Sequence, residues 1–163
     1  MDRVQRRGAT LLFAFAGFAY LLDRLTKLWA ERTLQEAPAD VIPGVLTLRF
    51  TTNSGGAFSI GGSAPWLFAG ATIIVSVLIV ATAFRHRNML TAVALGLILG
   101  GALGNLTDRV VRGSGLHGRV VDFIDFHIWP IFNLADSAIV VGAVLLAIAS
   151  MRPDEVSEAD VDA

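Results

Sequence analysis

The chain has 163 residues, of which 54% are hydrophobic and 17% are charged, and its formal net charge is −1. With a mean hydropathy of +0.63 this composition is more apolar than that of typical soluble domains, and it indicates a membrane protein. The absence of cysteine excludes disulfides, thiolate catalysis and cysteine-ligated metals. The absence of a basic stripe argues against a nucleic-acid partner.

Four apolar segments are predicted to cross the membrane as helices, at residues of about 9–30, 65–84, 89–106 and 131–151. Each is near the ~20 residues that span a bilayer core. The first is interpreted as a retained span, because "DRLTKLWAERT" follows it without the small-residue site at which a signal peptide is cleaved. We therefore expect an all-α membrane protein, a four-transmembrane-helix bundle in one domain over residues 1–152, with an acidic disordered tail at 153–163.

The segment between the first two spans predicts a small extramembrane β region at about residues 41–62. Pro43 and Gly44 indicate a turn, and Val45 to Thr52 are rich in β-branched residues. Residues 53–58 then follow as an edge or loop suited to contacting a peptide backbone.

Cationic residues near the span ends predict the orientation. Arg3, Arg6 and Arg7 precede the first span, and Arg85 and Arg87 lie in the short connection between the second and third. Because positive charge in short flanking segments favours the cytoplasm, we expect both termini to be cytoplasmic and the β region to lie on the outer face.

With this orientation, the spans that carry unusual polar residues near one end all have that end at the outer face. The polar residues are therefore expected to lie close together there. These residues form three pairs, and the two members of each pair lie three or four positions apart, so they share one helix face. Ionisable groups inside spans cost a few kcal/mol each, so such a cluster predicts a functional site. The pairs are Asp23 with Lys27, Asn105 with Arg109, and Asn133 with Asp136.

Each pair also has a purely structural explanation. Asp23 and Lys27 fit an interfacial ion pair with Lys27 extended to the headgroups, and the polar end of the third span fits a helix cap. Asp136 fits a first-turn carboxylate with Asn133 as the cap. None of these explanations accounts for Asp122, which lies in an apolar strand-like or loop segment with no helix to cap.

Two aspartates on one face suggest a specific chemistry. Carboxylates held close together cannot both ionise, so one keeps a proton while the other takes a proton from water. This is how aspartic peptidases hydrolyse peptides, without a metal, a cofactor or a covalent intermediate. Asp122 and Asp136 are the candidates, and Asp125 is a nearby competitor.

Five motifs occur in an order that resembles lipoprotein signal peptidase, also called signal peptidase II. The resemblance runs from about Leu11 to Met151. "GNLTDR" and "FNLADS" are moderately specific, and the five together are a strong signal. They are "DRLTK" at 23–27, "NSGGAF" at 53–58, "GNLTDR" at 104–109, "GRVVDF" at 118–123 and "FNLADS" at 132–137.

The resemblance implies a membrane-embedded aspartic endopeptidase that removes the signal peptide from diacylglyceryl-modified prolipoproteins, cutting before the lipidated cysteine. It implies a multi-pass protein of the bacterial inner membrane with its site at the periplasmic face, membrane lipids around it and globomycin-type inhibitors as ligands. A monomer without metal or cofactor is expected. The implied catalytic residues are Asp122 and Asp136, and the residues that line the site, orient the pair or hold substrate are Asp23, Lys27, Asn53, Asn105, Arg109 and Asn133.

One segment departs from the family pattern. The link "VVRGSGLHG" before the first catalytic aspartate is longer than usual, so Gly113 and Gly118 both compete for the family's glycine position.

A small proton-coupled or lipid-binding transporter is the alternative function, with Asp23, Lys27 and Asp136 as a relay. It predicts polar residues at the bilayer midplane and an internal repeat, and neither is evident in the sequence.

Overall fold

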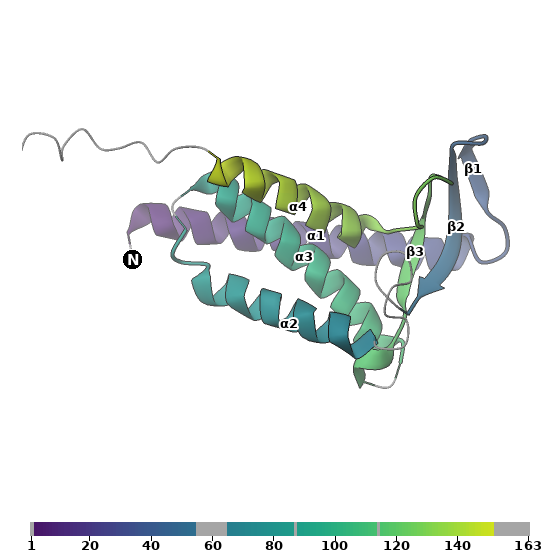
Figure 1. The fold of residues 1–163 in the computed structure, drawn as a ribbon, viewed down its shortest axis with the longest axis horizontal. Coiled ribbons are helices and arrows are strands. Elements are labelled where there is room, and N and C mark those ends of the chain that lie inside the picture. The colour runs from purple at the N-terminus through teal and green to yellow at the C-terminus, as the bar shows by residue number, and fades with distance from the viewer. Residues whose placement is uncertain (1, 55–64, 87, 114, 152–163) are drawn as a thin grey trace, which may run out of the picture.

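A computed structural model of the chain describes residues 2–54, 65–86, 88–113 and 115–151. Figure 1 shows the long helices side by side, with a small sheet at the end of the bundle opposite the N-terminus. The acidic segment 153–163 and the part of the β region beyond residue 54 lie outside the described residues. The elements are α1 (Arg3–Thr33), β1 (Ala39–Ile42), β2 (Leu46–Asn53), α2 (Pro65–Thr82), α3 (Met89–Val111), the 3-10 helix η2 (Gly115–His117), β3 (Val120–Asp125) and α4 (Leu134–Ser150).

Local capping sets the helix ends and explains why they differ from the apolar limits. The Asp2 side chain accepts a hydrogen bond from the Gln5 backbone N–H at 2.8 Å, so α1 begins six residues before the apolar segment. The last helix, α4, likewise begins at Leu134 rather than near residue 131, because Asn133 is its N-cap.

Glycines in α3 let its neighbours approach closely. A Cβ at position 96 would lie 2.5 Å from the Leu12 carbonyl oxygen of α1, and one at Gly142 of α4 would lie 2.7 Å from the Ala94 carbonyl oxygen of α3. Gly100 also faces the backbone of α1. The small residues of α3 therefore serve helix packing, and α3 contacts the other three helices.

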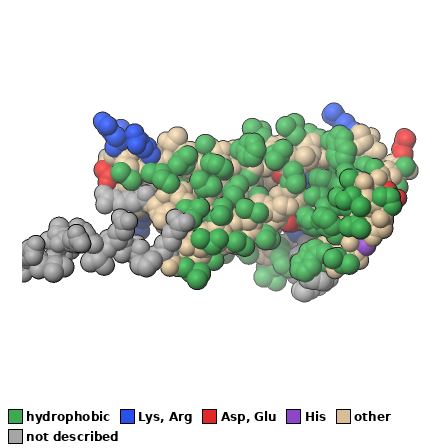
Figure 2. All heavy atoms as spheres, turned by 90° about the horizontal axis from the view of Figure 1, so that it is seen from above, with side chains coloured by type: hydrophobic (Ala, Val, Ile, Leu, Met, Phe, Trp, Pro, Cys, Tyr) green, Lys and Arg blue, Asp and Glu red, His purple; other side chains and the backbone are tan. Residues whose placement is uncertain are grey.

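The helices carry an apolar outer surface. Figure 2 shows hydrophobic side chains along the length of the bundle, with Lys and Arg side chains visible at its two ends. Among the described residues, α1 and α3 are long and apolar enough to cross a membrane, while Trp66–Thr82 and Leu134–Ser150 are shorter apolar helices. The helical prediction is confirmed; two of the four expected spans meet the length criterion.

The sheet has the order β1-β2-β3 and is antiparallel throughout. The predicted strand at Val45 to Thr52 corresponds to β2, and the turn before it contains Gly44 at φ 74°. The β2–β3 pairing places Thr51 opposite Asp122. Phe123 is buried against the end of α1, which attaches the sheet to the bundle.

Candidate active site

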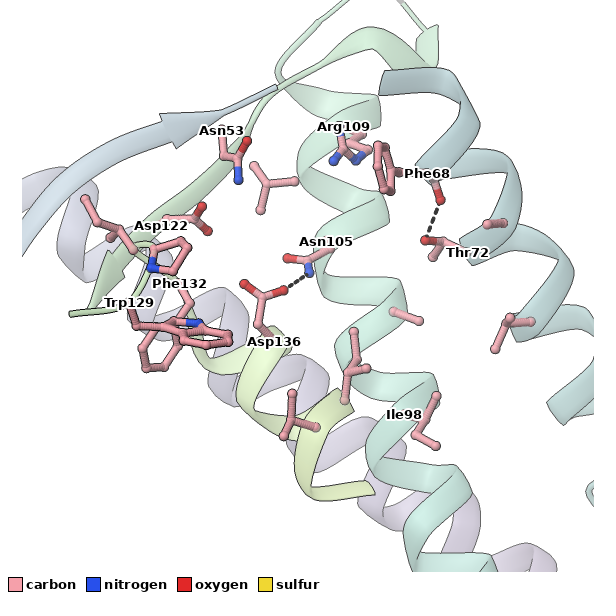
Figure 3. A pocket seen from close by; sticks show the side chains of 18 residues that line it. Asn53, Phe68, Thr72, Ile98, Asn105, Arg109, Asp122, Trp129, Phe132 and Asp136 are labelled. Carbon is pink, nitrogen blue, oxygen red and sulfur yellow. Dashed lines mark hydrogen bonds between the residues drawn. The ribbon is translucent and has the colours of Figure 1, made fainter. Parts of the chain in front are cut away.

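Asp122 and Asp136 reach one cavity from different elements. Asp122 lies on β3 and is 3% exposed, whereas Asp136 lies in the first turn of α4. The cavity, of about 460 Å³, lies among α2, α3 and α4 below the sheet. Figure 3 shows both carboxylates directed into this space, with Asn105 and Arg109 facing them from α3. The site residues predicted at Asn53, Asn105, Arg109, Asp122 and Asp136 all line it.

Two asparagines connect the aspartates. The Asn133 amide nitrogen donates to Asp122 Oδ1 at 2.6 Å, and the Asn105 amide nitrogen donates to Asp136 Oδ1 at 2.8 Å. Asn133 also donates to Asn105 Oδ1 at 3.3 Å, which completes a chain from one carboxylate to the other. The two carboxylates therefore belong to one hydrogen-bond network.

The cap and the site share the same residues. The Asn133 side chain accepts from the Asp136 backbone N–H at 2.9 Å, and Asp136 Oδ2 accepts from the Asn133 backbone N–H at 3.4 Å. The structural explanation of this pair is therefore correct as far as it goes. It does not exclude a site, because Asp136 Oδ1 faces the cavity network while Oδ2 completes the cap.

Electrostatics favour a proton on Asp122. Burial, and then the neighbouring charge of Asp136, raise the pKa of Asp122 from 3.8 to about 7, although hydrogen bonds from Asn133 and Asn53 and the charge of Lys27 act in the opposite direction. A carboxyl group of this kind is able to act as an acid near neutral pH.

Arg109 ties the strand ends to α3. Its Nη1 donates to the carbonyl oxygens of Ser54 and Gly118, each at 3.3 Å. The Gly118 backbone N–H returns a hydrogen bond to the Arg109 carbonyl at 3.1 Å, and a Cβ on Gly118 would collide with that carbonyl. Of the two glycines that compete in the long link, Gly118 is the one packed against Arg109, although Gly113 in turn packs on Gly118.

Asp23 and Lys27 lie behind the cavity and not in it. Both side chains are 0% exposed, and they form an ion pair at 2.9 Å. The alternative in which Lys27 extends to the headgroups is therefore wrong. Lys27 Nζ instead donates to Asn105 Oδ1 at 2.8 Å, which joins this ion pair to the asparagine that holds Asp136.

Asp125 faces away from the cavity. Successive strand residues point to opposite faces, so Asp125 and Asp122, three positions apart, point in opposite directions. Asp125 pairs with Arg49 at 2.7 Å and accepts from the His127 backbone N–H at 2.8 Å. Asp125 therefore contacts residues of the sheet and its loop, and it does not line the cavity.

The apolar cavity wall and Asp108 were not among the residues predicted for the site. Phe68, Thr72 and Val75 of α2 form part of the wall, and their sequence is that of any apolar helix. Asp108 is 0% exposed, and its place inside "GNLTDR" was the available signal. Among the described residues, no group of three His, Cys, Asp or Glu side chains is arranged to hold a metal ion.

Comparison with solved structures identifies the class of protein. One structure, described as a bacterial membrane enzyme solved by the in meso method at 2.3 Å resolution, matches with a TM-score of 0.76 and 33% identity, over 90% of this chain and 94% of that chain. Another with the same description, at 1.9 Å resolution, matches with a TM-score of 0.74 and 34% identity, over 88% and 94%. The fold is that of a bacterial membrane enzyme.

Sequence comparison identifies the family. A family model described as signal peptidase (SPase) II matches residues 15–152. A lipoprotein signal peptidase of Rhodococcus jostii is 41% identical over 149 residues, which are 90% of this chain and 74% of the relative. One of Streptomyces coelicolor is 43% identical over 149 residues, covering 90% and 73%. The chain belongs to the signal peptidase II family of peptidases, so the resemblance indicated by the five motifs is confirmed.

Proposed function

We propose that the chain is an aspartic endopeptidase that removes the signal peptide from diacylglyceryl-modified prolipoproteins, cutting before the lipidated cysteine. Family membership supports the removal of signal peptides from prolipoproteins. The observation that carries the aspartic mechanism is that Asp122 and Asp136 line one cavity and are linked through Asn133 and Asn105.

The proposed reaction divides acid and base between the two aspartates. Protonated Asp122 donates to the scissile carbonyl oxygen while Asp136 takes a proton from the attacking water, and the water oxygen bonds to the carbonyl carbon. When the tetrahedral intermediate collapses, the C–N bond breaks and Asp136 gives its proton to the amine. The hydroxyl proton returns to Asp122, so the pair is ready for another turnover.

The neighbouring polar residues support this division. Asn133 and Asn105 fix the orientation of the two carboxylates through the hydrogen bonds described above. Arg109 adds a cation facing both, and Asn53 reaches Asp122 from β2. Asp23 and Lys27 act from behind, because neither is exposed to the cavity.

The cavity walls suit an apolar substrate. Side chains of α2, α3 and α4, including Phe68, Ile98 and Ile139, form the side away from the sheet. We place the end of the signal helix along this wall, with the scissile bond at the aspartates and the lipid chains in the surrounding bilayer. A globomycin-type inhibitor would compete for the same wall.

The same proposal fixes the membrane arrangement. The four apolar helices would all cross the bacterial inner membrane as one domain, with both termini cytoplasmic and the sheet at the periplasmic surface. Support comes from Arg3, Arg6, Arg7 and Arg85, which lie in the short segments next to the helix ends on the N-terminal side, and from the position of Asp122 on β3. One copy of the chain supplies all the residues of the proposed site, which fits a monomer. The polar residues lie at one end of the bundle, so no observation favours the transporter alternative.

The test is cleavage of a purified diacylglyceryl-modified prolipoprotein in detergent, with EDTA present. Wild type and Asp125→Asn should cut, whereas Asp122→Asn and Asp136→Asn should not. Asp125 is the matched control, because it is a buried carboxylate on the same strand that faces away from the cavity.

The outcomes separate the parts of the proposal. Full activity in either variant of the pair would refute the two-aspartate mechanism. Failure of wild type to cut a correctly lipidated substrate would refute the proposed activity. If wild type cuts the substrate without EDTA but not with it, the reaction requires a metal and the metal-free mechanism is refuted.

A further inference from the structure

A buried charge cluster lies directly behind the aspartate pair. Its centre is formed by Asp23 and Lys27 of α1 and Asp108 of α3, whose side chains are all 0% exposed. Arg24 and Arg112 close it on the outer side, where their side chains are 17% and 20% exposed. Among the described residues that line the cavities, none belongs to this cluster, so it does not contact substrate directly.

Each aspartate of the cluster holds the backbone next to one aspartate of the pair. Asp108 Oδ2 accepts a hydrogen bond from the Val121 backbone N–H at 3.1 Å, and Val121 immediately precedes Asp122. Asp23 Oδ1 accepts from the Ala135 backbone N–H at 3.0 Å, and Ala135 immediately precedes Asp136. The buried carboxylate of Asp108 thus holds the strand that carries Asp122, and that of Asp23 holds the start of the helix that carries Asp136.

Lys27 joins the two halves. Its Nζ lies 2.9 Å from Asp23 Oδ2 and 3.2 Å from Asp108 Oδ2, and it donates to Asn105 Oδ1 at 2.8 Å. One N–H of the ammonium group thus donates to Asn105, while its charge pairs with the carboxylates of both Asp23 and Asp108. The separation of Val121 from Ala135 is therefore tied to a single cation.

The other carboxylate oxygen of Asp108 is held separately. Arg24 Nη1 and Arg112 Nε both contact Asp108 Oδ1, the latter at 3.2 Å. With Oδ1 fixed by two arginines, Oδ2 keeps one orientation toward Val121 and Lys27. The two arginines therefore fix the orientation of the Asp108 carboxylate as well as balancing its charge.

We propose that Asp108 is a positioning residue for Asp122, as Asp23 is for Asp136, and that Lys27 sets the two aspartates at their working separation. This inference rests on the proposed peptidase function. A cluster that merely joined α1 to α3 would not need to accept from both N–H groups that precede the aspartates. Displacing a catalytic group by about 1 Å costs about 100-fold in rate, so the effect on turnover should be large.

The experiment measures kcat and KM for cleavage of the lipidated prolipoprotein by wild type, Asp108→Leu, Asp108→Asn and the control Asp125→Asn. Asp108→Leu removes the acceptor for the Val121 N–H, so kcat should fall by about 100-fold or more while KM stays unchanged. Asp108→Asn keeps a carbonyl acceptor and should restore kcat to within about tenfold of wild type. Asp125→Asn should match wild type.

Hydrogen exchange gives a readout that does not depend on activity. Exchange in the segment 119–123 should be faster in Asp108→Leu, near wild type in Asp108→Asn and unchanged in Asp125→Asn. Unchanged kcat in Asp108→Leu would overturn the inference. So would loss of kcat in both Asp108 variants with exchange in this segment unaltered.

A milder variant covers the case in which Asp108→Leu does not fold. Arg24→Gln removes one of the two arginines from Asp108 Oδ1 and leaves the Val121 hydrogen bond in place. It should lower kcat by about two- to fivefold at unchanged KM and speed exchange of the same segment. If neither changes, the inference is wrong. An inactive wild type would instead refute the proposed function, so the two failures are distinguishable.

Discussion

Replacing Asp122 with Asn should abolish cleavage and yet stabilise the folded chain at alkaline pH. The buried carboxyl group has a pKa raised to about 7, from an ordinary value of 3.8, by burial first and by the charge of Asp136 second. The folded chain therefore disfavours the ionised form. Each pKa step of one corresponds to about 1.4 kcal/mol, so the full difference is about 4 kcal/mol.

The sign follows from comparing the folded and unfolded states. Because the pKa of Asp122 is higher in the folded state, its protonation adds stability that is complete below about pH 4 and is lost as the pH rises through about 7. Asn stays neutral, and its carbonyl oxygen is able to accept the hydrogen bond that Asn133 donates to Asp122. The gain should be below the full difference, about 1–3 kcal/mol, since the buried amide N–H₂ must also find partners.

The assay is unfolding of wild type and Asp122→Asn in the same detergent at pH 5 and pH 9. The variant should be more stable than wild type at pH 9, and this advantage should be about 2–3 kcal/mol smaller at pH 5, where the Asp122 carboxyl of the folded state is protonated. Asp125→Asn is the control, and its stability relative to wild type should be the same at both pH values, because Asp125 pairs with Arg49 away from the aspartate pair. A difference between wild type and Asp122→Asn that is independent of pH would refute the electrostatic reasoning.

Three further predictions concern pH, packing and surface charge. The cleavage rate should fall as the pH rises through about 7, because the pair then loses its proton; a constant rate up to pH 9 would contradict this. Gly100→Val should cost about 1–3 kcal/mol of unfolding free energy, since its Cβ faces the Ala16 carbonyl, whereas Gly17→Val, with open space around it, should be tolerated far better. Glu31→Gln breaks a partly exposed pair with Arg112, which should cost less than about 1 kcal/mol in the same unfolding assay; a larger loss would show that the pair supports the cluster behind it.

The helices were predictable because their signal is local. Apolar segments mark all four helices, and the i,i+4 spacing of Asp23 and Lys27 already placed both on one face. The ends were less accurate, because capping by Asp2 and Asn133 depends on single polar residues outside the apolar pattern. The pairing of β2 with β3 was not predicted, since it joins segments separated by two helices and leaves no periodic signal in either strand.

The site was predictable in its residues more than in its geometry. Spacing shows which residues share a face but not what that face meets, so it left open whether Lys27 lines the cavity or supports it. Alternation along β3 would have separated Asp122 from Asp125, had the segment been identified as a strand. Asp108, at the polar end of the third span, was left out of the candidate site because its partner is the backbone N–H of Val121, and a main-chain donor leaves no trace in the sequence.

The cavity among α2, α3 and α4 has a kinetic consequence. Its walls continue into helices whose outer surfaces are apolar, so enzyme and lipidated substrate should meet within one hydrophobic phase and not in water. The concentration that governs their encounter is then the mole fraction of substrate in that phase. Adding empty detergent micelles at fixed amounts of enzyme and substrate should slow cleavage, and adding water alone should change it little.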